Sequence, residues 1–152
     1  MLTKPDLGHS PQTVSWQGSN YTITVNRRDS GGIVGIFHAE VPPGGGPPIH
    51  IHHNEDEVIH VTHGEYEMWL DGATCRLKPG QSIFLPRGVP HTFRIVSQTP
   101  GRNVAVLTPG GFEQFFIDVA TRDLRIPRDM AELENVGATY GAEFLGPPRW
   151  QD

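Results

Sequence analysis

The sequence predicts an all-β domain, a barrel or sandwich of short strands followed by one or two C-terminal α-helices. Three observations lead to this prediction. Apolar and polar residues alternate over many short stretches, which is typical of half-buried strands. Gly (18 residues) and Pro (14 residues) are spread between those stretches as turns. The spacing of a helix face is found only in the last third of the chain.

The length of 152 residues suits one domain rather than two. We expect three parts within it. Residues 1–19 form an N-terminal arm, residues 20–110 form the β-barrel, and residues 111–152 form a helical extension of the same domain.

The first strand is predicted from residue 20, where Tyr21, Ile23 and Val25 alternate with polar residues. A turn at 29–32 separates it from the next strand, at 33–41. The segment 42–48, with glycines between prolines, cannot extend a ladder and is predicted as a loop. Seven more strands are predicted, at 49–53, 57–62, 66–70, 73–77, 82–85, 91–96 and 103–108. Two of them flank Asp71-Gly72, a strong hairpin signal.

The last third of the chain changes period. One apolar helix face is formed by Phe112, Phe115, Phe116, Val119 and Ala120. A second helix is predicted to begin near Pro127, with an apolar side made of Met130, Leu133, Tyr140 and Phe144, although Gly137 and Gly141 weaken it. We expect both helices to cover one end of the barrel; the alternative is a lid over a ligand site.

Composition excludes several partners. Lys and Arg number 12 and Asp and Glu number 17, so the formal net charge is −5. A mildly acidic chain without a basic run argues against nucleic acid or an anionic membrane as partner. No apolar stretch approaches the ~20 residues that a membrane span needs, and residues 1–12 lack the apolar core of a secretion signal. Because the single Cys75 cannot form a disulfide within the chain, we expect a cytoplasmic protein.

Histidines are concentrated between positions 50 and 63. His50 and His52 are two residues apart, so on a strand both imidazoles project from the same face. A carboxylate for that face must come from a neighbouring strand, and Glu57 begins the next one. The other histidines are assigned to the surface or to turns, on strand parity or position: His53, His60 and His63.

Two motifs over residues 44–95 resemble those of the cupin superfamily. The first, G-x5-H-x-H-x(3,4)-E-x6-G, is matched at every position by Gly44, His50, His52, Glu57 and Gly64. The second, G-x5-P-x-G-x2-H-x3-N, is matched by Gly80, Pro86, Gly88 and His91, with Ile95 in place of the final Asn. The resemblance implies a single cupin barrel, that is, a jelly roll or double-stranded β-helix.

The same resemblance implies a metal site whose four ligands are His50, His52, Glu57 and His91. Three neutral imidazoles and a carboxylate suit one divalent transition metal ion (Fe, Mn, Ni, Co, Cu or Zn) and leave a coordination position open. Glu55 is the alternative carboxylate, although it falls in the connection before the strand. The alternative for the whole site is a metal-free barrel with ordinary polar residues; cupins of that kind usually lose a ligand residue, whereas all four are present here.

The strand of His91 also predicts a pocket. His91, Phe93 and Ile95 share one parity, so an inward His91 brings the two apolar side chains to the same interior. We predict a substrate pocket lined by Phe37, Met68, Phe93 and Ile95, with ordinary core packing as the alternative for each of them. The cations available for an anionic substrate are Arg27, Arg28 and Arg94, and no carboxylate clamp is evident.

Among cupins the chain is most similar to the small quercetin-dioxygenase-like proteins, at residues 108–116 and 143–148. This resemblance implies a metal-dependent dioxygenase acting on an aromatic or flavonol-like small molecule. A substrate oxygen binds the metal, Glu57 accepts its proton, and dioxygen attacks the activated ring. The alternatives are an isomerase or lyase that uses the metal as a Lewis acid, and a non-catalytic binding protein. The resemblance further implies a homodimer formed through the N-terminal arm.

Overall fold

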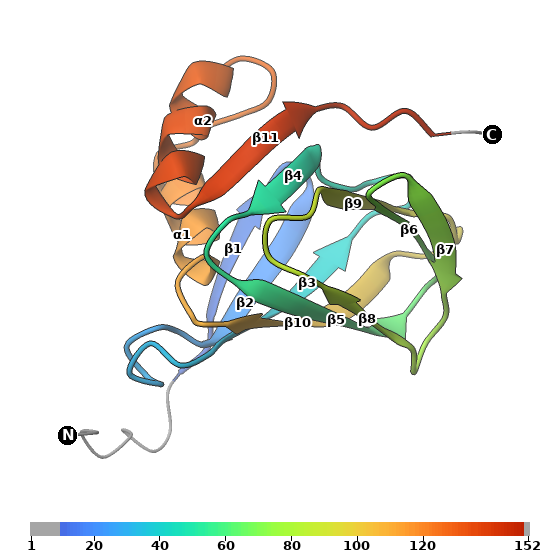
Figure 1. Ribbon diagram of the computed structural model, residues 1–152, viewed down its shortest axis with the longest axis horizontal. Helices are drawn as coiled ribbons and strands as arrows, with labels where there is room; N and C mark the ends of the chain where they lie inside the picture. The colour runs from blue at the N-terminus through green and yellow to red at the C-terminus, as the bar shows by residue number, and fades with distance from the viewer. Residues whose placement is uncertain (1–9, 151–152) are drawn as a thin grey trace.

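Two antiparallel sheets face each other in the computed structural model, which describes residues 10–150 (Figure 1). One sheet has the strand order β1-β2-β3-β10-β5-β8 and the other the order β11-β4-β9-β6-β7. The strands are β1 (Gln12–Trp16), β2 (Ser19–Val25), β3 (Gly35–Val41), β4 (Ile49–His52), β5 (Asp56–His63), β6 (Tyr66–Leu70), β7 (Ala73–Leu77), β8 (Ser82–Leu85), β9 (His91–Ile95), β10 (Gly101–Thr108) and β11 (Ala142–Gly146). The helices are α1 (Glu113–Thr121) and α2 (Met130–Thr139). The predicted all-β jelly roll with C-terminal helices is confirmed.

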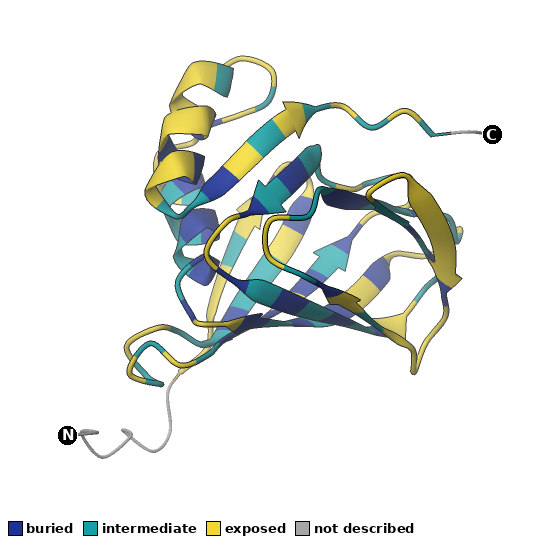
Figure 2. Ribbon diagram, in the orientation of Figure 1, coloured by how far each residue is buried: buried dark blue, intermediate teal, exposed yellow. Residues whose placement is uncertain are grey.

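The core lies between the two sheets. Buried residues alternate with more exposed ones along β3 and β10 (Figure 2). Tyr66 on β6 and Asn103 on β10 face each other across the barrel, and the Asn103 amide donates a 2.9 Å hydrogen bond to the Tyr66 hydroxyl. Both side chains are buried, so this bond satisfies polar groups that would otherwise be costly inside a core.

Strand β1 lies within the segment for which we predicted an arm. It pairs with β2 from Gln12 to Trp16 and so adds an edge strand to the first sheet of its own chain. Trp16 is buried, and its indole N–H donates a 2.6 Å hydrogen bond to the carbonyl of Leu124. The part of the predicted arm at residues 1–9 lies outside the described residues.

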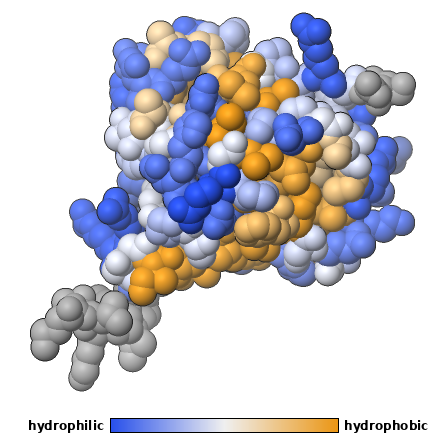
Figure 3. All heavy atoms as spheres, in the orientation of Figure 1, coloured by the Kyte–Doolittle hydropathy of each residue, from blue (hydrophilic) through white to orange (hydrophobic). Residues whose placement is uncertain are grey.

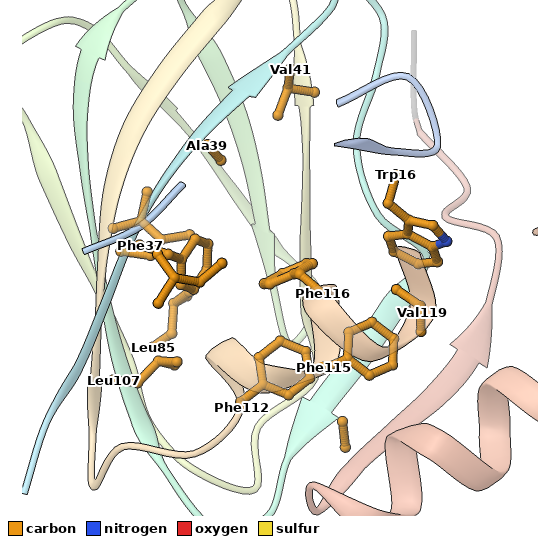
Figure 4. Packing of buried hydrophobic residues seen from close by; sticks show 14 of the residues in the cluster. Trp16, Phe37, Ala39, Val41, Leu85, Leu107, Phe112, Phe115, Phe116 and Val119 are labelled. Carbon is orange, nitrogen blue, oxygen red and sulfur yellow. The ribbon is translucent and has the colours of Figure 1, made fainter. Parts of the chain in front are cut away.

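Helix α1 packs its aromatic face against the open side of the barrel. Phe115, Phe116 and Val119 are buried there, and Phe37 of β3 lies against Phe116 (Figure 4). The first residue of the helix, Glu113, is a buried carboxylate that accepts hydrogen bonds from the backbone N–H groups of residues 27 (2.6 Å) and 111 (2.7 Å). It therefore ties the loop after β2 to the start of α1.

The second helix is shorter than its apolar pattern predicts. Helix α2 ends at Thr139, and Gly141 (φ 72°) takes a left-handed conformation that reverses the chain direction. The residues that follow form β11, which pairs with β4 along its length. Phe144, which we expected on the helix face, instead lies on a strand 5.8 Å from the ring of Phe115.

The face shown in Figure 3 carries hydrophobic side chains across its middle, over β4 and towards β8, with hydrophilic side chains on either side. Among the exposed large apolar residues are Phe84 on β8 and Leu145 on β11. Of the two described helices, neither is long and apolar enough to span a lipid bilayer.

Candidate metal centre

Three histidines meet inside the barrel. One ring nitrogen from each of His50, His52 and His91 lies within 4.8 Å of the other two, and all three side chains are buried. The rings are packed closely, with centroids 4.4 Å apart for His50 and His91 and 5.0 Å apart for His50 and His52. The motif histidines of two separate segments are thus brought to one point.

Strand pairing explains this convergence. β4 and β9 are paired at one position, where His50 lies opposite His91. Directly opposed residues of antiparallel strands project from the same face of the sheet. His52 is two residues further along β4 and therefore projects from that face as well.

Two backbone carbonyls fix the orientation of the rings. The Nδ1–H of His50 donates to the carbonyl of Pro48 at 2.9 Å, and the Nδ1–H of His91 donates to the carbonyl of Val89 at 3.1 Å. A neutral imidazole carries a single N–H, so these bonds leave the lone pair of each Nε2 free to face the cluster. This is the tautomer that an Nε2 metal ligand requires.

The carboxylate comes from the other sheet. Glu57 on β5 is buried, and its two oxygens face two of the rings. Oε2 lies 3.8 Å from Nε2 of His52, and Oε1 lies 3.9 Å from Nε2 of His91. The four side chains therefore connect the two sheets across the barrel interior.

Burial sets the protonation of the cluster. It lowers the pKa of all three imidazoles, that of His52 to about 3, and neighbouring histidine charges lower the values of His50 and His52 further. Burial, followed by the charge of Glu55, raises the pKa of Glu57 to about 8. Without a metal ion, the site at pH 7 holds three neutral imidazoles and a neutral carboxylic acid.

Buried ring nitrogens without a hydrogen-bond partner indicate whether a metal ion fits this site. Nε2 of His52 and of His91 are buried without a hydrogen-bond partner in the described part of the chain. Such atoms cost about 1–3 kcal/mol each unless something binds them. Two ligands that are each about 2.1 Å from one ion lie at most about 4.2 Å apart, and both nitrogen–oxygen distances to Glu57 fall within that limit. The donor set fits a divalent transition metal ion.

Glu55, the alternative carboxylate, lies on the other side of His52. Its Oε1 is 3.5 Å from Nδ1 of that ring, whereas the cluster is formed by Nε2. The side chain is buried, and burial raises its pKa to about 7 even though Arg87 lowers it. Neither Glu55 Oε1 nor His52 Nδ1 has a hydrogen-bond partner in residues 10–150, so each is the nearest candidate for the other.

A cavity of about 60 Å³ opens beside this cluster and is lined by His50, His52, His91 and Glu57 at one end. The rest of its wall is mainly aromatic and comes from both sheets and from the C-terminal extension. The aromatic members are Trp16, Tyr21, Phe37, Phe93, Phe112, Phe115, Phe116 and Phe144. A cavity of this kind binds apolar and aromatic groups.

Two of the four residues predicted for the pocket line the cavity, and the other two lie in the core. Phe37 and Phe93 line the cavity. Met68 and Ile95 point into the barrel but lie in its packed core, fully buried and away from the lining. Strand parity gives the side of the sheet to which a residue points, and it does not give the depth along the barrel.

Several lining residues were not predicted from the sequence. Trp16 falls in the segment assigned to the arm, and Phe112, Phe115 and Phe116 were assigned to barrel covering. Phe112 is in direct contact with the cluster, with its ring centroid 4.3 Å from that of His52. The aromatic bias of this helix face was the available signal, since core packing alone does not require three phenylalanines.

The cavity carries no cation. In the described chain, neither lysine nor arginine is among its lining residues. Arg94 is directed elsewhere, to Glu67 at 2.6 Å and to the ring of Trp150. The histidines are neutral, so the wall offers no compensating charge for a carboxylate or phosphate group.

Sequence comparison finds related proteins of several kinds. The chain is 30% identical over 96 residues to quercetin 2,3-dioxygenase of Bacillus subtilis, a match that covers 63% of this chain and 28% of that protein. It is 35% identical over 78 residues to Protein SchB of Streptomyces halstedii, covering 51% of this chain and 55% of that protein. The chain thus matches only between about a quarter and just over half of the length of these relatives.

Structural comparison finds the same barrel. KdgF from Halomonas sp. superposes with a TM-score of 0.59 at 20% identity, over 68% of this chain and 88% of that one. A protein from Thermotoga maritima, described as a predicted oxalate decarboxylase, gives a TM-score of 0.57 at 20% identity over 66% and 92% of the two chains. Residues 37–107 match the cupin domain family. Together with the barrel and its converging histidines, this match identifies residues 37–107 as a cupin domain.

Proposed function

We propose that this chain is a metal-dependent dioxygenase that acts on a neutral aromatic, flavonol-like small molecule. The observation that carries the proposal is the placement of His50, His52, His91 and Glu57 at the end of an aromatic cavity without a lysine or arginine in its described lining. The similarity to a quercetin 2,3-dioxygenase points in the same direction. Oxalate is a small dianion, and the described wall offers it no Lys or Arg besides the proposed metal ion.

In this proposal, the three imidazole Nε2 atoms and the Glu57 carboxylate hold one divalent transition metal ion. When bound, the ion supplies Lewis acidity and an open coordination position for an oxygen of the substrate or for dioxygen. Phe37 and Phe93 pack against the substrate ring and exclude water from it.

Glu57 is the proposed proton acceptor. A substrate hydroxyl group must lose its proton to make the ring electron-rich enough to react with dioxygen. A carboxylate that ligates a metal ion can accept such a proton when it leaves the ion, and Glu57 is the carboxylate of the proposed ligand set. Glu57 lines the cavity together with the imidazoles, so in this proposal its carboxylate accepts the proton of a group bound there.

Oxygen consumption tests the proposal. Protein loaded separately with Fe, Mn, Ni or Co is mixed with a panel of flavonols, and oxygen uptake and product mass are measured. We expect uptake with at least one metal and the incorporation of both oxygen atoms into the product. A product of unchanged composition formed without oxygen indicates a cupin isomerase, and binding without any product indicates a binding protein; either result contradicts the proposal.

Glu55 is proposed as the group that orients His52. Its replacement by Ala removes the carboxylate that lies 3.5 Å from Nδ1 of His52, so we expect metal affinity to fall about tenfold to hundredfold, while Glu55→Gln retains most of it. Competition with a chelating dye measures the change. Asp56→Asn is the matched control, because this neighbouring carboxylate faces Arg87 instead. Equal affinities for Glu55→Ala and Asp56→Asn refute the assignment.

A further inference from the structure

A second and larger hollow lies beside the metal-proximal cavity. It has a volume of about 520 Å³, compared with about 60 Å³ for the inner cavity. The two share part of their walls, at Trp16, Tyr21, Pro47, Pro48 and Phe93. The hollow and the cavity therefore adjoin each other at these five residues.

The inner chamber is too small for a large ligand. An engineered cavity of about 150 Å³ holds one benzene molecule, whereas binding sites for small molecules usually have about 300–1,000 Å³. The inner chamber accommodates a reacting group, and the hollow has the size that the rest of a ligand needs.

The wall of the hollow is apolar and uncharged. In the described residues its lining includes Val41, Ile126, Met130 and several prolines, and it includes no Asp, Glu, Lys or Arg. Its polar side chains include Gln17 and Ser19, and the Gln17 amide oxygen accepts a hydrogen bond of 3.2 Å from the backbone N–H of Ile126. This bond connects the β1–β2 turn to the segment between the helices, which are two walls of the hollow.

Trp16 and Tyr21, two of the residues that line both chambers, are held rigidly. The indole of Trp16 is fixed by its hydrogen bond to Leu124 and by edge-on contact with Phe115, whose centroid is 5.5 Å away. The ring of Tyr21 is stacked on Phe116 at 3.9 Å. Rigid aromatic walls lose little entropy when a ligand packs against them.

Most of the hollow lies outside the shared cupin segment. Ten of its sixteen lining residues come from residues 16–21, 126–130 and 146–148, and the other six lie within the cupin match at residues 37–107. The cupin segment thus supplies the three histidines and Glu57, and the flanking segments supply the larger part of the second chamber.

We infer that the ligand of this protein is an elongated neutral molecule with two parts, whose reacting end occupies the metal-proximal cavity and whose second apolar ring or chain occupies the outer hollow. The inference rests on the proposed function for the position of the reacting end. The five lining residues that the two chambers share, the sizes of the chambers and their uncharged outer lining determine the occupant.

Two probes with the same chelating head test this inference. 3-Hydroxyflavone carries a fused ring and a phenyl group beyond its hydroxy-ketone, whereas maltol lacks both. Calorimetry measures their dissociation constants for zinc-loaded and for metal-free protein. The variants are Ile126→Asp, which adds a charge to the hollow, and Met130→Trp, which fills it; Ile33→Asp is the control at an exposed isoleucine.

We expect both hollow variants to raise the dissociation constant of 3-hydroxyflavone by about tenfold or more, with and without zinc. The dissociation constant of maltol should change by less than about twofold. Thermal melting followed by circular dichroism verifies that each variant is folded. Unchanged affinity for 3-hydroxyflavone, equal loss for both probes, or no binding of 3-hydroxyflavone to either form of the wild type overturns the inference. The inference is also overturned if the hollow variants change the molecular mass measured by light scattering without changing the affinity for 3-hydroxyflavone. In that case a second copy of the chain fills the hollow. If the hollow variants lose affinity for 3-hydroxyflavone alone but the wild type does not consume oxygen, the assignment of the second chamber is supported and the dioxygenase proposal fails.

Discussion

Replacing His91 with alanine is expected to abolish metal binding. Protein purified without a histidine tag should contain about one divalent ion per chain, and the His91→Ala variant should contain almost none. His91 is a central member of the cluster, because it lies opposite His50 across the strand pair and 3.9 Å from Glu57. Loss of an outer-shell partner costs about tenfold to hundredfold in affinity, and loss of a direct ligand should cost more.

The matched control for this experiment is His53→Ala. His53 follows His52 directly in the sequence, but its side chain is on the surface, where it pairs with Glu143 at 2.8 Å. Elemental analysis of the wild type, His50→Ala, His91→Ala and His53→Ala proteins compares the four ion contents. Retention of the ion in both His50→Ala and His91→Ala, or an equal loss in His53→Ala, would refute the assignment of the cluster as a metal site.

The metal-free protein is expected to become less stable as the pH rises from 6.5 to 8. Burial raises the pKa of Glu57 to about 8, so the folded state keeps this proton in a range where the unfolded state, with its ordinary value of 4.5, has lost it. Unfolding then releases a proton, and the free energy of unfolding falls by about 1.36 kcal/mol per pH unit. The expected loss over this range is about 2 kcal/mol.

The three histidines do not oppose this decline. Their pKa values are lowered in the folded state, so they reduce stability only below their ordinary value of 6.5 and are neutral in both states above it. A bound metal ion removes the decline, because it holds the Glu57 carboxylate in its deprotonated form.

Urea unfolding of chelator-treated protein at several pH values measures this effect. Glu57→Gln is the informative variant, because its amide resembles the protonated acid in shape and does not titrate. We expect it to retain the stability of the wild type at pH 6.5 and to lose most of the decline towards pH 8. A wild type whose stability is constant or rises over this range would show that Glu57 does not hold a proton in the metal-free site.

The strands that carry the site could be predicted because their evidence is local. Alternation along β4 and β5 and the spacing of His50, His52, Glu57 and His91 are properties of the chain itself. What could not be predicted depends on partners that are distant in the sequence. Trp16 is buried and donates a hydrogen bond to the carbonyl of Leu124, 108 residues further along the chain, and nothing near residue 16 indicates this.

The same reason applies to the pocket and to the C-terminal strand. Phe93 and Ile95 have the same strand parity, yet Phe93 lines the cavity while Ile95 packs in the core, since depth along a barrel is set by neighbouring strands. Tyr140 and Phe144 have the four-residue spacing of a helix face, but Gly141 between them turns the chain. A single conformational break thus outweighs the periodic pattern.

The pairing of β11 with β4 has a consequence for the order of biosynthesis. β4 is joined to β9 at one residue pair and along its other edge to β11, where Ala142 lies opposite His52. During translation the strand that carries two of the histidines lacks this neighbour until residues 142–146 have emerged from the ribosome. The strand that carries two of the histidines therefore gains its second neighbour only after the other strands of the barrel have been synthesised.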